Sequence, residues 1–296
     1  MLQPQIEEIK KGNERHIARA ISWVENKSDG YLDLLKKLNG HTKVIGITGP
    51  PGAGKSTLVN SLVQHWSNQG QRIAILAVDP SSVFNFGSLL GDRLRMQSLF
   101  LLPNVYIRSI SSRGSLGGLS AAIIEIVEVL KHASFDRIII ETVGVGQSEV
   151  EIAGVADTTV VVSVPESGDE IQTLKSGVME IADVFVVNKS DREGALAFVS
   201  YLKKLAHSRA TSNWEVPVIA TQALSGVGIK DLSIAIDQHA SFNTSPERKL
   251  MLLAEKAHLL IQQKRMANLS VNAIKERLTI ESQLPDFNLF NWIEQF

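Results

Sequence analysis

The pattern of apolar residues changes near residue 42. Before that point, apolar side chains recur at steps of three and four residues, which predicts helices over residues 5–40. The residues that set this period are Ile6, Ile9, Ile17, Ile21 and Val24. A polar run at 26–30 interrupts it, and a second short helix is predicted over 31–38. We interpret residues 1–41 as an N-terminal helical extension.

From residue 43 the chain alternates short apolar segments with longer segments that suit helices. The short segments are rich in β-branched residues and lie at 43–48, 72–78, 105–108, 137–141, 158–164, 184–188 and 217–220. Most are apolar throughout, which is typical of strands buried on both faces of a parallel sheet. The alternation predicts an α/β fold with a doubly wound, mainly parallel sheet, over residues 42–242.

The strand pattern stops after Phe242. Ser245 followed by Pro246 predicts a helix start, because serine caps helices and proline suits the first helical position. One long amphipathic helix is predicted from there to about Leu278, and an aromatic-rich tail follows. We assign residues 243–296 to a C-terminal helical extension, which could pack on its own core or serve as a dimerisation arm.

Composition narrows the function classes. The net charge is −1, with 30 basic and 31 acidic residues, so the chain lacks the basic excess that nucleic-acid partners usually require. Its lack of cysteine excludes disulfides and thiolate metal sites and is compatible with a reducing compartment. No apolar run approaches the roughly 20 residues of a membrane span. We expect a cytoplasmic protein without a nucleic-acid or membrane partner.

Residues 49–56 match the phosphate-binding pattern G-x-x-x-x-G-K-[ST]. The loop follows a predicted strand and precedes a predicted helix over 56–69, as its mechanism requires. Its glycines let successive backbone N–H groups face phosphate oxygens at a helix N-terminus. Lys55 is predicted to reach the β- and γ-phosphates, and Ser56 to hold Mg²⁺. The predicted phosphate-binding residues are Gly49, Pro50, Pro51, Gly52, Ala53, Gly54, Lys55, Ser56 and Thr57.

A second motif predicts which base is bound. Asn188, Lys189 and Asp191 form N-K-x-D at the end of a predicted strand. The Asp191 carboxylate can accept hydrogen bonds from N1–H and the 2-amino group of guanine, and adenine offers neither. Leaving a carboxylate unpaired costs enough to favour GTP and GDP over adenine nucleotides. Ala223 and Leu224 are the predicted backbone contact to the guanine O6.

Carboxylates at strand ends complete the predicted chemistry. Glu141 ends a strand and can hold Mg²⁺ directly or through water, and Gly144 would offer its N–H to the γ-phosphate. Gln147 could orient the attacking water or could be a solvent-facing loop residue. Asp79 ends another strand on the ligand side of a parallel sheet. Asp92 joins the magnesium shell if its helix packs nearby, and is otherwise a helix-surface charge.

Longer stretches carry a family resemblance. The sequence resembles the methylmalonyl-CoA mutase-associated GTPases of the MeaB/ArgK type, whose members are also labelled LAO/AO transport system kinases or ATPases. The similarity spans roughly residues 8–275. The runs that carry it are N-K-S-D at 188–191 and the segments 77–82, 87–96, 111–120, 141–153 and 168–183.

The resemblance implies a homodimeric GTPase of the SIMIBI class. It implies a chaperone that gates cofactor loading of an adenosylcobalamin-dependent acyl-CoA mutase and protects that mutase. Gln172 and Lys175 then fall in a third switch at the dimer or partner surface, although Lys175 by its chemistry alone would be a helix-surface lysine. The resemblance implies a magnesium set of Ser56, Asp79, Asp92 and Glu141. Lys55, Glu141 and Gln147 are the predicted catalytic residues.

Two other functions stay open at the level of the sequence. One is a kinase or ATPase acting on a lysine-arginine-ornithine periplasmic binding protein, against which the guanine motif argues. The other is a metal-insertion GTPase, against which the lack of cysteine and the seven scattered histidines argue.

Overall fold

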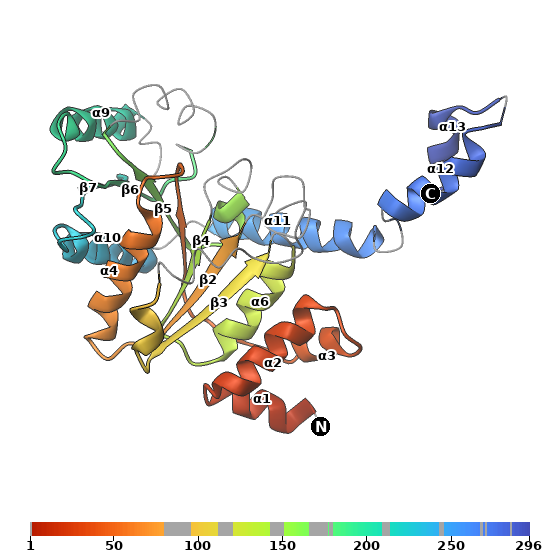
Figure 1. Ribbon diagram of the computed structural model, residues 1–296, viewed down its shortest axis with the longest axis horizontal. Helices are drawn as coiled ribbons and strands as arrows, with labels where there is room; N and C mark the ends of the chain where they lie inside the picture. The colour runs from red at the N-terminus through yellow and green to blue at the C-terminus, as the bar shows by residue number, and fades with distance from the viewer. Residues whose placement is uncertain are drawn as a thin grey trace. The chain divides into compact units, whose positions relative to one another are not determined.

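The computed structural model describes residues 2–79, 96–111, 121–142, 151–165, 177, 180–208, 214–242, 246–266, 269, 271–284 and 286–296. The chain forms two compact units, Met1–Lys249 and Leu250–Phe296. The first contains a sheet flanked by helices, and the second is helical (Figure 1).

Three helices precede the sheet: α1 (Leu2–Lys10), α2 (Glu14–Glu25) and α3 (Tyr31–Leu35). The predicted break at 26–30 is confirmed, because Gly30 begins α3 in a left-handed conformation (φ 82°). A further break lies at Gly12 (φ 78°), where the Arg72 guanidinium donates to the Gly12 carbonyl at 3.2 Å. The apolar face of α2 packs against α6 (Ala121–His132), as its spacing predicts.

All seven predicted strands are present and form one parallel sheet in the order β3-β2-β4-β1-β5-β6-β7. The α/β fold class is therefore confirmed. The strands are β1 (Val44–Thr48), β2 (Ile73–Asp79), β3 (Val105–Ser111), β4 (Arg137–Glu141), β5 (Thr158–Ser163), β6 (Val184–Val187) and β7 (Val218–Ala220). β1 lies between β4 and β5, so the loop that leaves its end has a strand end on each side.

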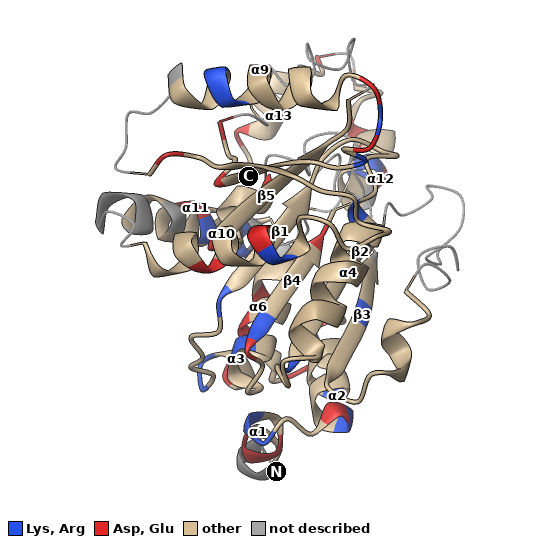
Figure 2. Ribbon diagram, turned by 90° about the vertical axis from the view of Figure 1, so that its left-hand side faces the viewer, with Lys and Arg blue, Asp and Glu red and all other residues tan. Residues whose placement is uncertain are grey.

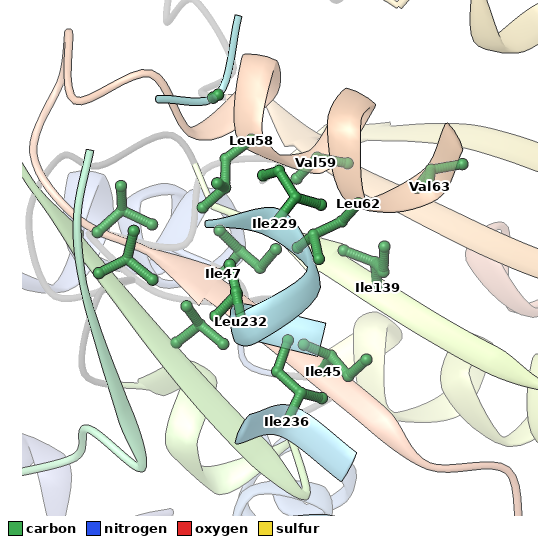
Figure 3. Close-up of a cluster of buried hydrophobic side chains, with 14 of the residues drawn as sticks. Ile45, Ile47, Leu58, Val59, Leu62, Val63, Ile139, Ile229, Leu232 and Ile236 are labelled. Atoms are coloured by element: carbon green, nitrogen blue, oxygen red, sulfur yellow. The ribbon is translucent and has the colours of Figure 1, made fainter. Parts of the chain in front are cut away.

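Helices cover both faces of the sheet. On one face, α4 (Lys55–Ser67) and α10 (Ile229–Ser241) interdigitate over β1, as the side chains of Leu58, Ile47 and Leu232 show in Figure 3. On the other, α9 (Ala195–Ser208) packs on β5 and β6. Two short turns, η1 (Leu99–Leu101) and η2 (Ile152–Gly154), complete this unit. Charged residues lie mostly on helices and loops, whereas the strands contain few (Figure 2).

The C-terminal segment forms α11 (Pro246–Arg265), α12 (Val271–Glu281) and α13 (Leu289–Ile293). The predicted start at Pro246 is confirmed, but the prediction of one helix reaching Leu278 is wrong. Between the two helices, the Leu269 N–H donates to the Met266 carbonyl at 2.9 Å, which is a turn and does not continue α11.

Within Leu250–Phe296, α12 and α13 share a small aromatic core. Trp292 is 5% exposed and its indole N–H donates to Glu281 Oε2 at 2.5 Å. The Arg277 guanidinium lies 5.4 Å from the Trp292 ring centroid and 4.6 Å from that of Phe296. In the described part of the chain, no helix is both long and apolar enough to cross a membrane.

Candidate functional site

A cavity of about 460 Å³ opens at the carboxyl ends of the central strands. The sequence predicted most of its lining, since it gathers the loop after β1, the tip of β4 and the lysine of N-K-x-D. Three further lining residues, Ala77, Val78 and Thr142, lie in the segments 77–82 and 141–153 that carry the family resemblance, but none of them was predicted as a site residue. The cavity is lined by Pro51, Gly52, Gly54, Lys55, Ser56, Thr57, Ala77, Val78, Glu141, Thr142 and Lys189.

Two glycines of the loop allow close backbone approach. A Cβ on Gly49 (φ 138°) would lie 2.0 Å from the Val162 carbonyl oxygen of β5, so no other residue fits without moving the loop. Gly54 (φ 85°) caps the start of α4, and a Cβ there would lie 2.4 Å from Asn188 Nδ2. The loop root therefore sits directly on β5, and the first turn of α4 sits on the residue that begins N-K-x-D.

Lys55 is buried at the start of α4, with 6% of its surface exposed. Its ammonium donates to the carbonyls of Gly49 at 2.7 Å and Pro50 at 3.0 Å. A buried charge needs such hydrogen-bond partners. The loop carbonyls thereby hold the positively charged Lys55 ammonium at the wall of the cavity.

Glu141 and Ser56 meet at the same cavity. The Ser56 hydroxyl donates to Glu141 Oε1 at 2.6 Å, and Glu141 is 7% exposed. A hydroxyl and a carboxylate are oxygen donors of the kind that Mg²⁺ takes in nucleotide sites. This pair therefore fits the magnesium role that the sequence predicts for it.

Other predicted residues are placed only in part or not at all. Asp79 ends β2, where it pairs with Ser111 of β3. Outside the described residues lie Asp92, Gly144, Gln147, Gln172 and Lys175.

Asn188 joins the two motifs. It is 2% exposed, and its Nδ2 donates to the Ala53 carbonyl at 2.9 Å. Its Oδ1 accepts from the Thr221 hydroxyl and from the Ala223 N–H, each at 3.1 Å. Three segments from β1, β6 and β7 are thus held by one amide. No sequence motif marks Thr221, and only the observed hydrogen bonds reveal its part.

The other residues that the sequence predicts at the guanine base lie nearer the surface than Asn188. The Lys189 ammonium donates to the Gly52 carbonyl at 2.8 Å, with its backbone left-handed (φ 54°). Asp191 is exposed, and Leu224 is 95% exposed. Because the Ala223 N–H already donates to Asn188, any contact of this N–H with a base has to be shared.

A family profile matches most of the chain. The profile described as methylmalonyl Co-A mutase-associated GTPase MeaB matches residues 17–277. The chain belongs to the MeaB family of GTPases. It is a P-loop GTPase of the MeaB/ArgK type, in agreement with the two motifs that meet at Asn188.

Relatives of the MeaB family support this assignment. A protein of Pyrococcus horikoshii, whose name assigns it to the GTPases provisionally, is 44% identical over 267 residues, which cover 87% of this chain and 82% of that protein. The GTPase ArgK of Escherichia coli is 36% identical over 247 residues, covering 79% of this chain and 75% of its own length.

The fold also resembles a solved structure. A crystal structure titled LAO/AO transport system kinase superposes with a TM-score of 0.68, covering 99% of this chain and 95% of that chain. Its sequence identity is 24%, so the likeness supports the fold.

Proposed function

We propose that this GTPase is a nucleotide-dependent chaperone of an adenosylcobalamin-dependent acyl-CoA mutase of the methylmalonyl-CoA mutase type. In this role it gates cofactor loading and protects the mutase from inactivation, with GTP hydrolysis as the switch. The observation that carries the proposal is the family match over residues 17–277, because that family is named for its association with the mutase.

The phosphate end of the cavity suits magnesium-bound GTP. The backbone N–H groups of the loop, to which Pro50 and Pro51 contribute none, and the Lys55 ammonium would bind the phosphates. Ser56 and Glu141 would hold Mg²⁺, and Asp79 and Asp92 would complete its shell. When bound, Mg²⁺ supplies charge neutralisation at the β- and γ-phosphates. The 2.6 Å contact between Ser56 and Glu141 supports this assignment.

For the base and the switch, we propose roles that follow the motifs. Asp191 reads guanine, and Leu224 offers its N–H to the O6 together with Ala223. Lys189 lies along the loop beneath the base. Gly144 contacts the γ-phosphate and Gln147 orients the attacking water. We place Gln172 and Lys175 at the surface that contacts a partner.

For the assembly, we propose a cytoplasmic homodimer formed through the C-terminal unit. The support is the number of large apolar side chains that this unit leaves exposed. They include Leu253, Val271, Ile280, Leu284, Phe290 and Ile293. Sedimentation of the full chain and of a chain that ends after residue 249 measures the number of chains per particle. We expect two for the full chain and one for the shortened chain. The same number in both samples would contradict a dimer formed through the C-terminal unit.

A binding and loading assay tests the chaperone function. The chain is mixed with apo-mutase in the presence of GDP, GTP or a non-hydrolysable GTP analogue, and co-elution and adenosylcobalamin transfer are measured. We expect the complex to depend on the nucleotide and the transfer to require hydrolysis. Transfer that is equal with GDP and GTP would contradict the proposal. Phosphate transfer to a purified amino-acid-binding protein would instead favour the kinase alternative.

A further inference from the structure

Two buried threonines join the strand that carries Glu141 to the strand that leads into the phosphate loop. The Thr142 hydroxyl donates to the Thr48 hydroxyl at 2.9 Å, and the residues are 1% and 0% exposed. Thr48 ends β1 and is followed at once by Gly49, whereas Thr142 directly follows Glu141. The pair therefore links the two segments that bring Ser56 and Glu141 to one point.

The backbone around this pair fixes its register. Ile47 pairs with Glu141 in the β1–β4 ladder, and the Thr142 N–H extends the ladder by donating to the Ile47 carbonyl at 3.0 Å. On its other side, Thr48 pairs with Val161 of β5. The base of the phosphate loop is thus fixed from both neighbouring strands, and Thr142 supplies the side-chain bond on the β4 side.

Alternation along β4 gives this bond its effect on Glu141. Ile47 and Ile139 face α4, and Glu141 lies two residues after Ile139, so its carboxylate projects to the same face and reaches Ser56. Thr142 therefore projects to the opposite face, where Thr48 holds it. Threonine is β-branched and its χ1 has few allowed values, so the bond resists rotation of the strand end.

We infer that the Thr142–Thr48 hydrogen bond is a positioning device for magnesium-dependent GTP binding. It holds the end of β4 so that the Glu141 carboxylate stays beside Ser56. Thr48 and Thr142 act through Glu141 and are positioning residues. The inference rests on the proposed function, since it requires Ser56 and Glu141 to hold the metal.

Thr142→Val tests the inference because valine keeps the branched shape and removes the hydroxyl. The measurement is the affinity of the full chain for a fluorescent GTP analogue in excess MgCl₂ and in EDTA. We expect Thr142→Val to reduce the ratio of the two affinities by about 10- to 100-fold, as the loss of an outer-shell partner does in metal sites. Thr142→Ser, which keeps the hydroxyl, retains most of the ratio.

Thr158→Val is the matched control. Thr158 lies at the opposite end of the sheet, is 1% exposed and shares a 2.8 Å hydrogen bond with His239 Nδ1. We expect Thr158→Val to lose about as much stability against urea as Thr142→Val does, and to keep the wild-type ratio of the affinities in MgCl₂ and in EDTA. Thr48→Val removes the same bond from its other side and replaces Thr142→Val if that variant does not fold.

The outcomes separate this inference from the proposed function. A wild-type chain that binds the analogue equally with and without Mg²⁺ would contradict the proposed magnesium site and this inference with it. A magnesium ratio that is present in the wild type and unchanged in Thr142→Val and Thr48→Val would contradict the inference alone. The threonine pair would then contribute stability only.

Discussion

The Ser56 hydroxyl donates a 2.6 Å hydrogen bond to Glu141 Oε1, across 85 residues of sequence. One partner lies in the first turn of α4 and the other at the end of β4. The two oxygens that we propose as magnesium ligands are therefore adjacent in the folded chain. A hydroxyl ligates a metal through an oxygen lone pair, so Ser56 can keep donating its O–H to Glu141 while its oxygen holds Mg²⁺. The bond therefore keeps both groups in place at the metal position.

Glu141→Gln removes the charge and keeps the shape and an acceptor oxygen for Ser56. We expect magnesium-dependent GTP affinity to fall by about 10- to 100-fold, because a carboxylate is the stronger ligand for a hard cation. Titration of Mg²⁺ against nucleotide binding measures this. Glu193→Gln, at an exposed position, is the control. Unchanged magnesium dependence in Glu141→Gln would remove Glu141 from the proposed metal set.

Asp191→Asn should change which base is bound. An amide can donate to the 2-oxo group of xanthine, whereas it no longer accepts from both N–H groups of guanine. We expect GTP affinity to fall by about 10³-fold and the affinity for xanthosine triphosphate to rise. Competition between the two nucleotides measures the change. Asp231→Asn, on the exposed side of α10, should alter neither affinity, and retained GTP preference in Asp191→Asn would refute guanine recognition by this carboxylate.

Asn188→Ala should weaken both the fold and nucleotide binding. It leaves the Ala53 carbonyl and the Ala223 N–H without their partner, at about 1–3 kcal/mol of unfolding free energy. Urea unfolding and GTP titration are the two measurements. Asn104→Ala is the matched control, because that amide likewise ties two segments, through the carbonyls of Ser67 and Gln71. It should cost similar stability without altering GTP affinity.

If Asn188→Ala and Asn104→Ala lowered stability and GTP affinity to the same extent, nucleotide binding would simply follow global stability. The specific role of Asn188 in joining the phosphate loop to the base-reading loops would then be wrong.

Gly49→Ala should abolish tight nucleotide binding by moving the phosphate loop. Its Cβ would collide with the Val162 carbonyl at 2.0 Å. Gly70→Ala is the control, since a Cβ at Gly70 (φ 78°) would have no atom within 4 Å. This substitution costs only the roughly 1–2 kcal/mol of an alanine in the left-handed conformation. Calorimetric GTP titration compares the two. Equal GTP affinity in both variants would show that the loop tolerates displacement.

Stability should depend on pH through Glu125 of α6. Glu125 is 5% exposed, and its Oε2 has no hydrogen-bond partner among the described residues. Burial raises the pKa of its carboxyl above 4.5, and Lys27 opposes the rise. The nearby Tyr31 has a raised pKa for the same main reason, burial, with a smaller contribution from the Glu125 charge.

The direction of the pH effect follows from the raised pKa. Across the range between the unfolded and folded pKa values, the folded chain binds more protons at Glu125 than the unfolded chain does. The contribution of this carboxyl to the free energy of unfolding is therefore fully present below pH 4.5, and it is lost as the pH rises through the pKa of the folded chain. Glu125→Gln should therefore raise the unfolding free energy near neutral pH by on the order of 1 kcal/mol, with little gain in acid. Urea unfolding across this range measures it. Equal stabilisation by Glu125→Gln in acid and near neutral pH would contradict this prediction.

The sequence predicted the sheet well because each strand is a short run of β-branched apolar residues buried on both faces. It missed the break at Gly12, whose carbonyl accepts a hydrogen bond from Arg72, 60 residues away. It also predicted the phosphate loop and N-K-x-D, whose spacing is local. The sequence and its family resemblance placed Ser56 and Glu141 in one magnesium set. The direct hydrogen bonds of Ser56 with Glu141 and of Thr48 with Thr142 were not predicted, since they depend on the register between β1 and β4. A single sequence does not state that register.

The aromatic core shared by α12 and α13 makes the C-terminal unit separately observable. Trp292 is the one tryptophan in Leu250–Phe296, whereas the other three of the chain, Trp23, Trp66 and Trp214, lie in the first unit. Replacing those three with phenylalanine leaves an intrinsic emission signal that comes from Trp292 alone. Its wavelength would follow the melting of the C-terminal helices while circular dichroism followed the whole chain, so the order in which the two units unfold can be read from one sample.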